Sequence, residues 1–167
     1  MSDDQTARWA LPLLHAGQAQ KEMFHNEALA LIDMLLHGVV ESADLNAPPA
    51  APALGQGWIV GAGATGAWAG RAGAIAGWTA GGWRFVTPRE GLSMIVADRG
   101  HAMIHEGGAW LDGPLRADGL HVGNNRVVGA QAPAIADPAG GSVADAEARA
   151  ALAAILEALR GHGLIAA

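Results

Sequence analysis

Glycine and tryptophan are concentrated between Gly55 and Trp110, and this combination most restricts how the chain folds. Fourteen of the 24 glycines and five of the six tryptophans lie in that stretch. Glycine at this density breaks helices and permits turns, whereas tryptophan favours the pleated, half-buried surface of a sheet. Turn signals recur at short intervals between apolar residues, which is typical of short antiparallel strands joined in a meander. The stretch therefore predicts a β-rich module.

The apolar runs between these turns predict where the strands lie. Side chains alternate along the runs, as they do in half-buried antiparallel strands, and the glycine-rich stretch 61–66 is typical of a turn. A proline-rich linker over residues 47–52 precedes the first strand. We expect strands over 57–60, 67–69, 75–79, 83–87, 93–97, 102–105 and 109–110, with a further short strand at 126–128.

Two segments that flank this module have the periodicity of helices. Apolar side chains recur at three-four spacing between residues 17 and 37, and a second helix follows Ser142 and Asp145, which resemble a capping box. The first stripe spans only two heptads, which is short for an isolated coiled coil, so we expect its helix to pack against another element. The alanine-rich stripe of the second helix permits close approach, so we expect this helix to pack against copies of itself or on the body of the protein. The residues predicted to mediate this assembly are Phe24, Ala28, Leu31, Leu35, Leu152, Ile155 and Leu159.

Three consecutive polar residues, His25, Asn26 and Glu27, interrupt the first helical stripe in its middle. An asparagine buried at a helix interface fixes the register and the oligomeric state of the assembly. The alternative is that these side chains face solvent or cap a neighbouring loop. The sequence leaves both interpretations open.

The order of these elements predicts an α+β fold. It comprises an N-terminal arm and assembly helix (1–46), a glycine- and tryptophan-rich antiparallel β meander (47–113), and an extended segment with a C-terminal helix (114–167). Much of the 51% hydrophobic content is alanine, which contributes little buried area, so each core is expected to be thin. Because thin cores need partner subunits, we expect a homo-oligomer.

The charge pattern excludes several classes of partner. The net charge is −6 and the ten basic residues are scattered singly, so the chain lacks the basic stripe that nucleic-acid binding requires. No apolar run approaches the length of a membrane span, and the N-terminus is acidic, which argues against a secretory signal. The absence of cysteine excludes disulfides and thiol catalysis. We therefore predict neither nucleic-acid nor membrane binding.

The motifs that suggest a cofactor or a metal are incomplete. Residues 61–66 match the glycine fingerprint of dinucleotide-binding proteins, but no helix pattern follows, and no acidic residue lies about twenty positions on. His101 and His105 share a strand face and would be suitable metal ligands, but only His121 offers a third. Structural roles explain these histidines better. We predict no cofactor and no metal.

Catalytic arrangements are equally weak. The chain has no Gly-x-Ser-x-Gly motif, and carboxylate pairs such as Asp98 with Glu106 can be chosen in any chain with sixteen acidic residues. We predict that the protein is not an enzyme. Exposed aromatic side chains are the remaining route to a ligand, because an indole face stacks on the apolar face of a sugar ring. The candidates are Trp68, Trp78, Trp83 and Trp110, although a role in the small core of the meander is favoured for most of them.

Two parts of the sequence resemble known proteins. The run from Leu13-Leu14-His15-Ala16-Gly17-Gln18-Ala19-Gln20-Lys21-Glu22-Met23-Phe24 to Asp33 resembles the start of an uncharacterised domain family in prophages and gene transfer agents of alphaproteobacteria. Four later runs resemble the rest of that domain: Gly55 to Gly70, Ile75-Ala-Gly-Trp, Gly82-Trp-Arg-Phe and Pro88-Arg-Glu-Gly. The resemblance therefore covers about residues 9–113. The tail from Val127 to Ile165 is similar to C-terminal segments of phage tail-fibre and spike proteins.

Together these resemblances imply a structural component of a phage-like particle. They imply a gene transfer agent head spike or spike base, or alternatively a tail-fibre or baseplate-associated protein, that supports attachment to the host cell surface. Its partners would be copies of itself (a trimer or a pentamer), other capsid, spike or fibre proteins, and cell-surface polysaccharide. It would be made in the bacterial cytoplasm and incorporated into the particle. Longer relatives carry further receptor-binding domains, so we expect a base or an adaptor. A polysaccharide-binding or polysaccharide-degrading module is the other alternative.

Overall fold

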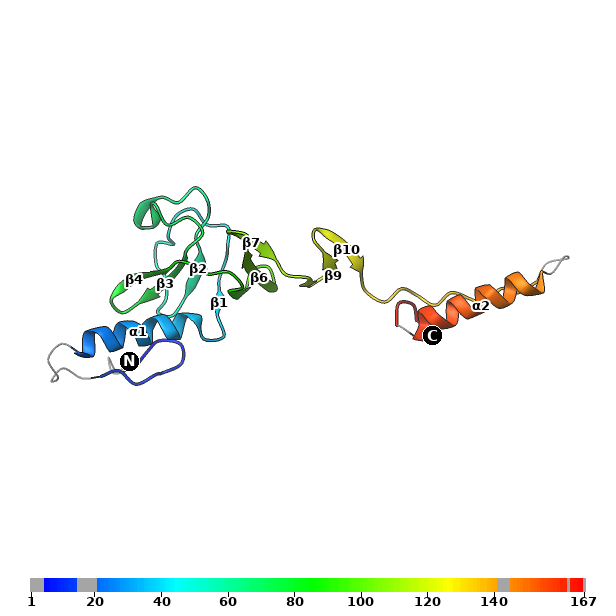
Figure 1. Cartoon of the computed structure of the whole chain (residues 1–167), viewed down its shortest axis with the longest axis horizontal. Helices are drawn as coiled ribbons and strands as arrows, with labels where there is room; N and C mark the ends of the chain where they lie inside the picture. Colours follow the sequence, from blue (N-terminus) through cyan, green and yellow to red (C-terminus); the bar gives the residue numbers. More distant parts are fainter. Residues whose placement is uncertain (1–4, 15–20, 141–144, 162, 167) are drawn as a thin grey trace. The chain divides into compact units, whose positions relative to one another are not determined.

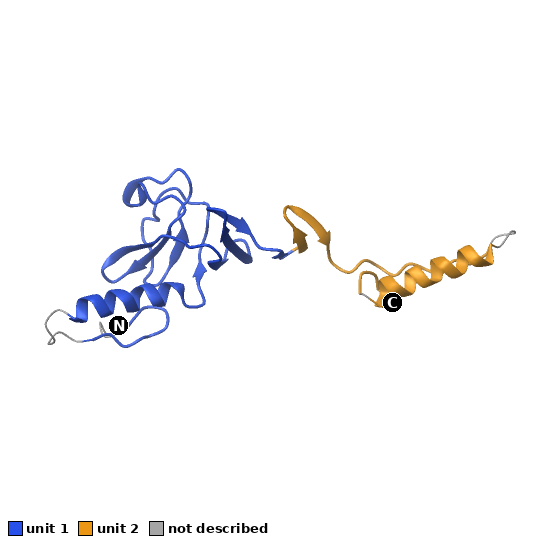
Figure 2. Ribbon diagram, in the orientation of Figure 1, with its two compact units in different colours: residues 1–117 blue, residues 118–167 orange. Residues whose placement is uncertain are grey.

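The computed structural model describes residues 5–14, 21–140, 145–161 and 163–166. The chain divides into two compact units, residues 1–117 (unit 1) and residues 118–167 (unit 2), which Figure 2 shows in different colours. Both units combine helix and antiparallel strands, so the predicted α+β class is confirmed. The N-terminal helix and the β meander, which we expected as separate segments, lie in the same unit.

Unit 1 contains one α-helix and eight of the named strands, and unit 2 contains a hairpin and the second helix (Figure 1). The elements of unit 1 are α1 (Lys21–Leu35), β1 (Val39–Val40), β2 (Gly57–Ile59), the 3-10 helix η1 (Gly66–Trp68), β3 (Ile75–Thr79), β4 (Gly82–Val86), β5 (Ser93–Val96), β6 (His101–Glu106), β7 (Ala109–Asp112) and β8 (Leu115–Arg116). Those of unit 2 are β9 (Gly119–Val122), β10 (Asn125–Val128) and α2 (Ala146–Gly161).

Strands β2, β3 and β4 form an antiparallel meander whose two faces have different neighbours. Trp58 lies opposite Ala76, and Trp78 lies opposite Trp83, so one face carries the tryptophans. Gly77 belongs to the other face, where an added Cβ would lie 2.6 Å from Met34 Cε of α1. Glycine at this position therefore lets the helix approach the sheet closely, and Figure 1 shows α1 running beside β3 and β4.

The second sheet of unit 1 has the strand order β1-β5-β6-β7. Strands β5, β6 and β7 are antiparallel neighbours, as the meander pattern predicts. Strand β1, by contrast, pairs parallel with β5, with Val39 opposite Ile95. The amide of Ile95 donates to the carbonyl of Gly38 (2.9 Å), and that of Ala97 donates to Val40 (2.8 Å). The sequence analysis did not predict this two-residue strand.

Residues 67–69, for which we predicted a strand, lie at the 3-10 helix η1 instead, so that prediction is wrong. The segment is enclosed by Gly66 (φ +59°) and Gly70 (φ +74°), whose left-handed conformations end any extended run on either side. The amide of Trp68 donates to the carbonyl of Thr65 (3.1 Å), which closes the turn and directs the indole inward.

The main core of unit 1 joins α1 to both sheets. Leu31 and Leu35 of α1 pack against it from the edge. Its buried side chains are Met34, Val40, Ile59, Ile75, Met94, Val96 and Met103. Since Met34 comes from the helix and the others come from the strands and their flanks, the helix and the meander fold as one body. A smaller core on the tryptophan face comprises Trp58, Val60, Trp68 and Ala76.

Unit 2 consists of the β9–β10 hairpin, an irregular segment and α2. Asp145 accepts a hydrogen bond from the amide of Ala148 (2.8 Å) and so caps the start of α2, whereas Ser142 of the predicted capping box lies outside the described residues. At the other end Gly163 adopts φ +72°, and the amide of Leu164 donates to the carbonyl of Leu159 (2.9 Å). Among the described residues of this unit, only His121, Leu156 and Ile165 are buried.

Candidate functional site

The aromatic candidates for sugar stacking occupy different environments. Trp68 is 0% exposed and packs against Trp58 and Trp83, with ring centroids 6.0 and 5.2 Å away. Its indole is the centre of the small core, so a sugar could reach it only if that core opened. Trp68 is therefore a core residue, and its prediction as a ligand-binding residue is wrong.

Trp78 and Trp83 are half-buried and pack edge to face, with their centroids 5.0 Å apart. Phe85 lies on the same face of β4, opposite Ala76, and the guanidinium of Arg71 lies 5.1 Å from the centre of its ring. We call Trp78, Trp83 and Phe85 the aromatic patch. The sequence analysis missed Phe85 and Arg71, although the alternation of Trp83 and Phe85 along β4 indicates a shared face.

Trp110 is half-buried and lies apart from the patch, on the other sheet. Its Nε1 donates to the carbonyl of Gly73 (2.8 Å), and its ring meets His105 at a centroid distance of 5.4 Å. The first contact ties strand β7 to the loop that precedes β3, and the second ties it to β6. The observed role of Trp110 is therefore to hold the two sheets of unit 1 together.

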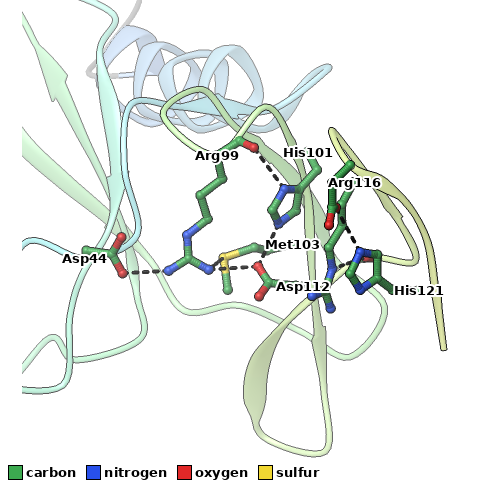
Figure 3. Close-up of polar contacts among 9 residues, drawn as sticks. Asp44, Arg99, His101, Met103, Asp112, Arg116 and His121 are labelled. Atoms are coloured by element: carbon green, nitrogen blue, oxygen red, sulfur yellow. Dashed lines mark hydrogen bonds and ion pairs between the residues drawn. The ribbon is translucent and has the colours of Figure 1, made fainter. Parts of the chain in front are cut away.

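A network of ion pairs surrounds Asp112, which accepts from His101 Nε2 (2.8 Å) and from Arg99 Nη1 (2.8 Å) (Figure 3). Arg99 also donates to Asp44 (2.6 Å). The hydrogen bond from His101, followed by the contact with Arg99, outweighs partial burial and holds the pKa of Asp112 below its ordinary value. Although burial opposes it, the hydrogen bonds to Asp112 and Asp44 raise the pKa of Arg99.

The histidines considered as metal ligands are engaged in other contacts. His101 Nδ1 lies 3.0 Å from the carbonyl of Arg99, so both ring nitrogens of His101 face acceptors. His105 packs against Trp110, and in unit 2 His121 Nε2 pairs with Asp118 (2.9 Å). The hydrogen bond from His121 lowers the pKa of Asp118. Within the described residues, no three acidic, histidine or cysteine side chains are grouped so as to hold a metal.

The glycine-rich stretch 61–66 uses its amides within the chain. Gly61 donates to the carbonyl of Leu45 (2.9 Å), Gly63 to Asn46 Oδ1 (3.0 Å) and Thr65 to the carbonyl of Asn46 (2.7 Å). An added Cβ at Gly61 would lie 2.4 Å from Asn46 Oδ1, so glycine is required for the close approach. These contacts shape the loop around Asn46, and a 3-10 turn follows it where a phosphate-binding motif would begin an α-helix.

The predicted assembly stripe of α1 is divided between two faces of the helix. Leu31 and Leu35, which we predicted to be assembly contacts, are half-buried and pack against the core of unit 1. Phe24 is 81% exposed, and Ala28 is also exposed. Ile32 and Leu36, the residue that follows α1, widen the predicted stripe and continue this surface. We call Phe24, Ala28, Ile32 and Leu36 the outer face of α1.

The polar residues in the middle of α1 bind neighbouring segments. Asn26 Oδ1 accepts from the amide of Leu14 (2.9 Å), and Asn26 Nδ2 donates to the Leu14 carbonyl (3.0 Å). Glu27 forms an ion pair with Arg84 of β4 (2.8 Å). His25 is exposed, and its ring contacts the carbonyl of Lys21. Of the two interpretations left open by the sequence, the structure has the one in which Asn26 caps a neighbouring segment.

That segment, residues 5–14, runs along α1 and is here called the strap. Buried Asp33 accepts from Thr6 Oγ1 (2.7 Å) and from the amides of Arg8 (2.9 Å) and Trp9 (2.7 Å). The Arg8 guanidinium donates to the carbonyls of Asp33, Met34 and His37, which lie at the end of the helix. The strap thus satisfies carbonyls that have no partner within the helix.

A groove of about 550 Å³ lies between the strap, α1 and the β3–β4 hairpin. Its volume is within the range of small-molecule sites. Ala30 and Met34 line it from the helix, Leu13 from the strap, and Ala80 from the hairpin. The ion pair of Glu27 and Arg84 also borders it. The groove is therefore mainly apolar, although the charged residues Arg8 and Asp33 also line it. No local pattern in the sequence predicts this groove, because the strap, α1, residues 54–56 and the β3–β4 hairpin, which form it, are far apart in the chain.

The predicted stripe of α2 is largely uncovered. Leu152 and Ile155 are 50% and 55% exposed, and Leu159 is half-buried. Leu156, next to the stripe, is the residue of α2 that is buried within unit 2. Arg160 instead holds the irregular segment, since its Nη1 pairs with Asp137 (3.0 Å).

None of the helices in the described part of the chain has the length and apolar character needed to cross a membrane. The comparison with curated proteins finds no match. The model of one family, described as "Protein of unknown function (DUF2793)", matches residues 25–111, which is just over half of the chain. That range includes most of α1 and all of the strands from β1 to β6. The chain therefore belongs to the DUF2793 family.

Proposed function

We propose that this chain is a structural, non-enzymatic component of a phage-like particle, built from several copies of itself, that supports attachment of the particle to a host cell. A head spike or spike base of a gene transfer agent is the preferred form, and a tail-fibre or baseplate-associated protein is the alternative. The observation that carries the self-assembly is the sparse core of unit 2.

Unit 2 has too little buried surface to be stable as a single copy. Three described residues are buried, and large apolar side chains such as Val122 and Ile135 are exposed. An isolated helix of 16 residues is only marginally stable in water. Ordering these elements costs conformational entropy, which burial against a partner must offset. The partner therefore has to cover the hairpin and the exposed side of α2.

The stripe of α2 is suited to a second copy of the same helix. Ala148, Leu152, Ile155 and Leu159 follow the four-three-four spacing of a coiled-coil seam. Small residues flank the seam, including Ala151, and permit the helix backbones to approach closely. A seam of this kind is self-complementary, because two identical helices bring the same apolar side chains to the same positions along their contact.

The assignment to a phage-like particle rests on sequence resemblance. Residues 9–113 resemble a domain family of prophages and gene transfer agents, and the tail resembles fibre and spike proteins. A module with a stable body and a self-associating tail has the organisation that such a component needs. Its other partners would be capsid, spike or fibre proteins.

A second function, binding of cell-surface polysaccharide, is favoured by the aromatic patch. Trp78 and Trp83 keep part of their rings exposed, and Arg71 beside Phe85 supplies hydrogen-bond donors. This combination of aromatic faces and polar groups is suited to a sugar ring. The patch would provide the adhesive property of the assembled particle.

The oligomeric state of the full chain tests the self-assembly. We expect sedimentation velocity to give a closed oligomer, and Leu152→Asp and Ile155→Asp to convert it to a smaller species with unit 1 still folded. Ala150→Asp, on an exposed position away from the seam, is the matched control and should remain oligomeric. Wild-type chain that sediments as a monomer at high concentration would refute the proposal. A trimer would favour a fibre, and a pentamer would favour a seat at a capsid five-fold vertex.

Two further measurements test the particle and the ligand. The chain should co-purify with particles from cells that produce them, and particles that lack it should attach poorly to host cells. Titration with host capsular polysaccharide should quench tryptophan fluorescence, and Trp78→Ala and Trp83→Ala should each weaken this binding. Leu111→Ala, on the exposed surface of β7, should leave it unchanged. Attachment without the protein contradicts the particle role, and equal binding by the tryptophan variants contradicts the sugar site.

A further inference from the structure

We propose that the groove of unit 1 is the binding site for Phe24 of a second copy of this chain. This inference rests on the proposed self-assembly and specifies a second interface, distinct from the seam of α2.

Phe24 is the side chain that most needs a partner. It is 81% exposed, next to Met23, which is 67% exposed, in the first turn of α1. Aromatic side chains contribute large apolar areas when they are buried, and they are frequent anchors of interfaces. Water around such a ring is released when the ring enters an apolar pocket.

The groove is ready to receive a ring of this size. Its volume of about 550 Å³ exceeds what one aromatic side chain requires, and Ala30, with its small side chain, leaves the space above the helix open. The walls are fixed before binding, because Asp33 and Asn26 hold the strap and the Glu27–Arg84 pair holds the hairpin side to α1. A preformed site avoids the entropy of ordering loops on association.

A second copy is the occupant because the projecting ring and the groove lie on the same helix. Met23, Glu27 and Ala30 line the groove, and Phe24 lies on the adjoining outer face. In the proposed interface two such helices meet about a two-fold axis, so that each Phe24 enters the groove of the other copy and the two contacts are equivalent. The charges agree with this arrangement. Exposed Lys21 precedes Phe24 by one turn, and the carboxylate of Glu27, with its side chain 45% exposed, borders the groove.

The test uses engineered cysteines, because the native chain has none. One full-length chain carries His25→Cys beside the projecting ring, and a second carries Ala80→Cys at the edge of the groove. Both substituted residues are exposed. The two chains are mixed, refolded together and mildly oxidised, and cross-linked peptides are identified by mass spectrometry. We expect a disulfide between position 25 of one chain and position 80 of the other.

Two variants show whether the ring and the groove create this cross-link. Adding Phe24→Ala to the His25→Cys chain, or Ala30→Leu to the Ala80→Cys chain, should lower the yield about tenfold or more. Ala109→Leu, an exposed strand position outside the groove, is the control for the second variant and should leave the yield unchanged. Circular dichroism checks that each variant remains folded.

The outcomes separate this inference from the proposed function. Disulfides between two copies of position 25, in place of the 25–80 pair, would refute the groove and indicate pairing of the outer faces. An oligomer without the 25–80 cross-link would likewise refute the groove and leave assembly through α2 intact. A chain that remains monomeric throughout refutes both. A 25–80 yield that survives both Phe24→Ala and Ala30→Leu shows that the ring does not enter the groove.

Discussion

Unit 1 and unit 2 achieve order in different ways. In unit 1, α1 and two sheets share a buried core, and a second core of tryptophan rings lies on the opposite face of one sheet. In unit 2, a hairpin and a helix leave nearly all their apolar side chains exposed among the described residues. The first unit has the interior that a folded domain requires, whereas the second has surfaces that match an interface.

The contrast indicates that the two units have different roles. A unit whose core is complete stays folded, and can bind a ligand, at any protein concentration. In the assembly that we propose, copies of unit 2 cover one another and so supply the interior that this unit lacks. The stability of the two units should therefore respond differently to mutation and to dilution. The six tryptophans all belong to unit 1, so their fluorescence reports on that unit alone.

The largest effect is expected for Trp68→Ala. It removes a fully buried ring from the tryptophan core, and aromatic truncations of this kind cost about 3–5 kcal/mol of unfolding free energy. Denaturant titration followed by tryptophan fluorescence measures the loss. Leu111→Ala on the exposed surface should change stability by less than about 0.5 kcal/mol. Equal effects of the two changes would show that unit 1 lacks a specific core.

Asp33→Ala should have the next largest effect, about 3 kcal/mol, because three donors of the strap lose their acceptor. Hydrogen exchange should then show fast exchange at the amides of Arg8 and Trp9, with the core strands still protected. Asp98→Ala, at an exposed position after β5, is the control. Unchanged protection of Arg8 and Trp9 would mean that Asp33 does not hold the strap.

Leu152→Ala tests unit 2 directly. If copies cover the seam, the change costs about 2 kcal/mol or more, as for a buried leucine, and the melting temperature of α2 depends on protein concentration. If the seam stays exposed, the cost is below about 0.5 kcal/mol. Leu156→Ala, which truncates a side chain already buried within the unit, should destabilise α2 in either case. If the melting temperature of α2 did not depend on protein concentration, the proposal that unit 2 is stabilised by other copies would be contradicted.

The smallest effect concerns pH. The pKa of Asp112 is lowered in the folded state, so its contacts stabilise unit 1 above the unfolded-state pKa of about 3.9. That stability is lost as the pH falls through the lower, folded-state pKa. Denaturation midpoints between pH 6 and pH 2 should therefore decline less steeply for Asp112→Asn than for the wild type. Parallel curves would show that the network around Asp112 contributes nothing.

Local patterns in the sequence predicted most elements of unit 1. Strand β3 was predicted with its observed bounds, and strands β2, β4, β5, β6 and β7 were placed to within a residue or two. The short strand β8, and strand β9 of unit 2, were not predicted. The alternation of side chains and the glycine turns are local features of the sequence, so they can be recognised without knowledge of the fold. Strand β1 escaped prediction because two valines have no period, and its parallel partner β5 lies more than fifty residues away.

The candidate sites depended on contacts that no local pattern contains. The helical period identified Phe24 and Leu31 as members of one stripe, but which residue meets the core depends on where the sheets lie. Spacing also did not distinguish Trp68 in the core from Trp78 near the surface. The groove requires the strap, α1 and the hairpin to meet, so it is a property of the tertiary structure alone.

The strap also bears on how the chain matures during synthesis. Residues 5–14 leave the ribosome before their acceptors and partners, Asn26, Asp33 and the carbonyl of His37. The strap must therefore wait for the helix before it can dock. Until then its apolar residues, such as Leu11 and Leu13, are open to chaperones that bind nascent chains. A change that weakens Asp33 would prolong this interval, and would reduce the yield of protein in cells more than its effect on the finished fold suggests.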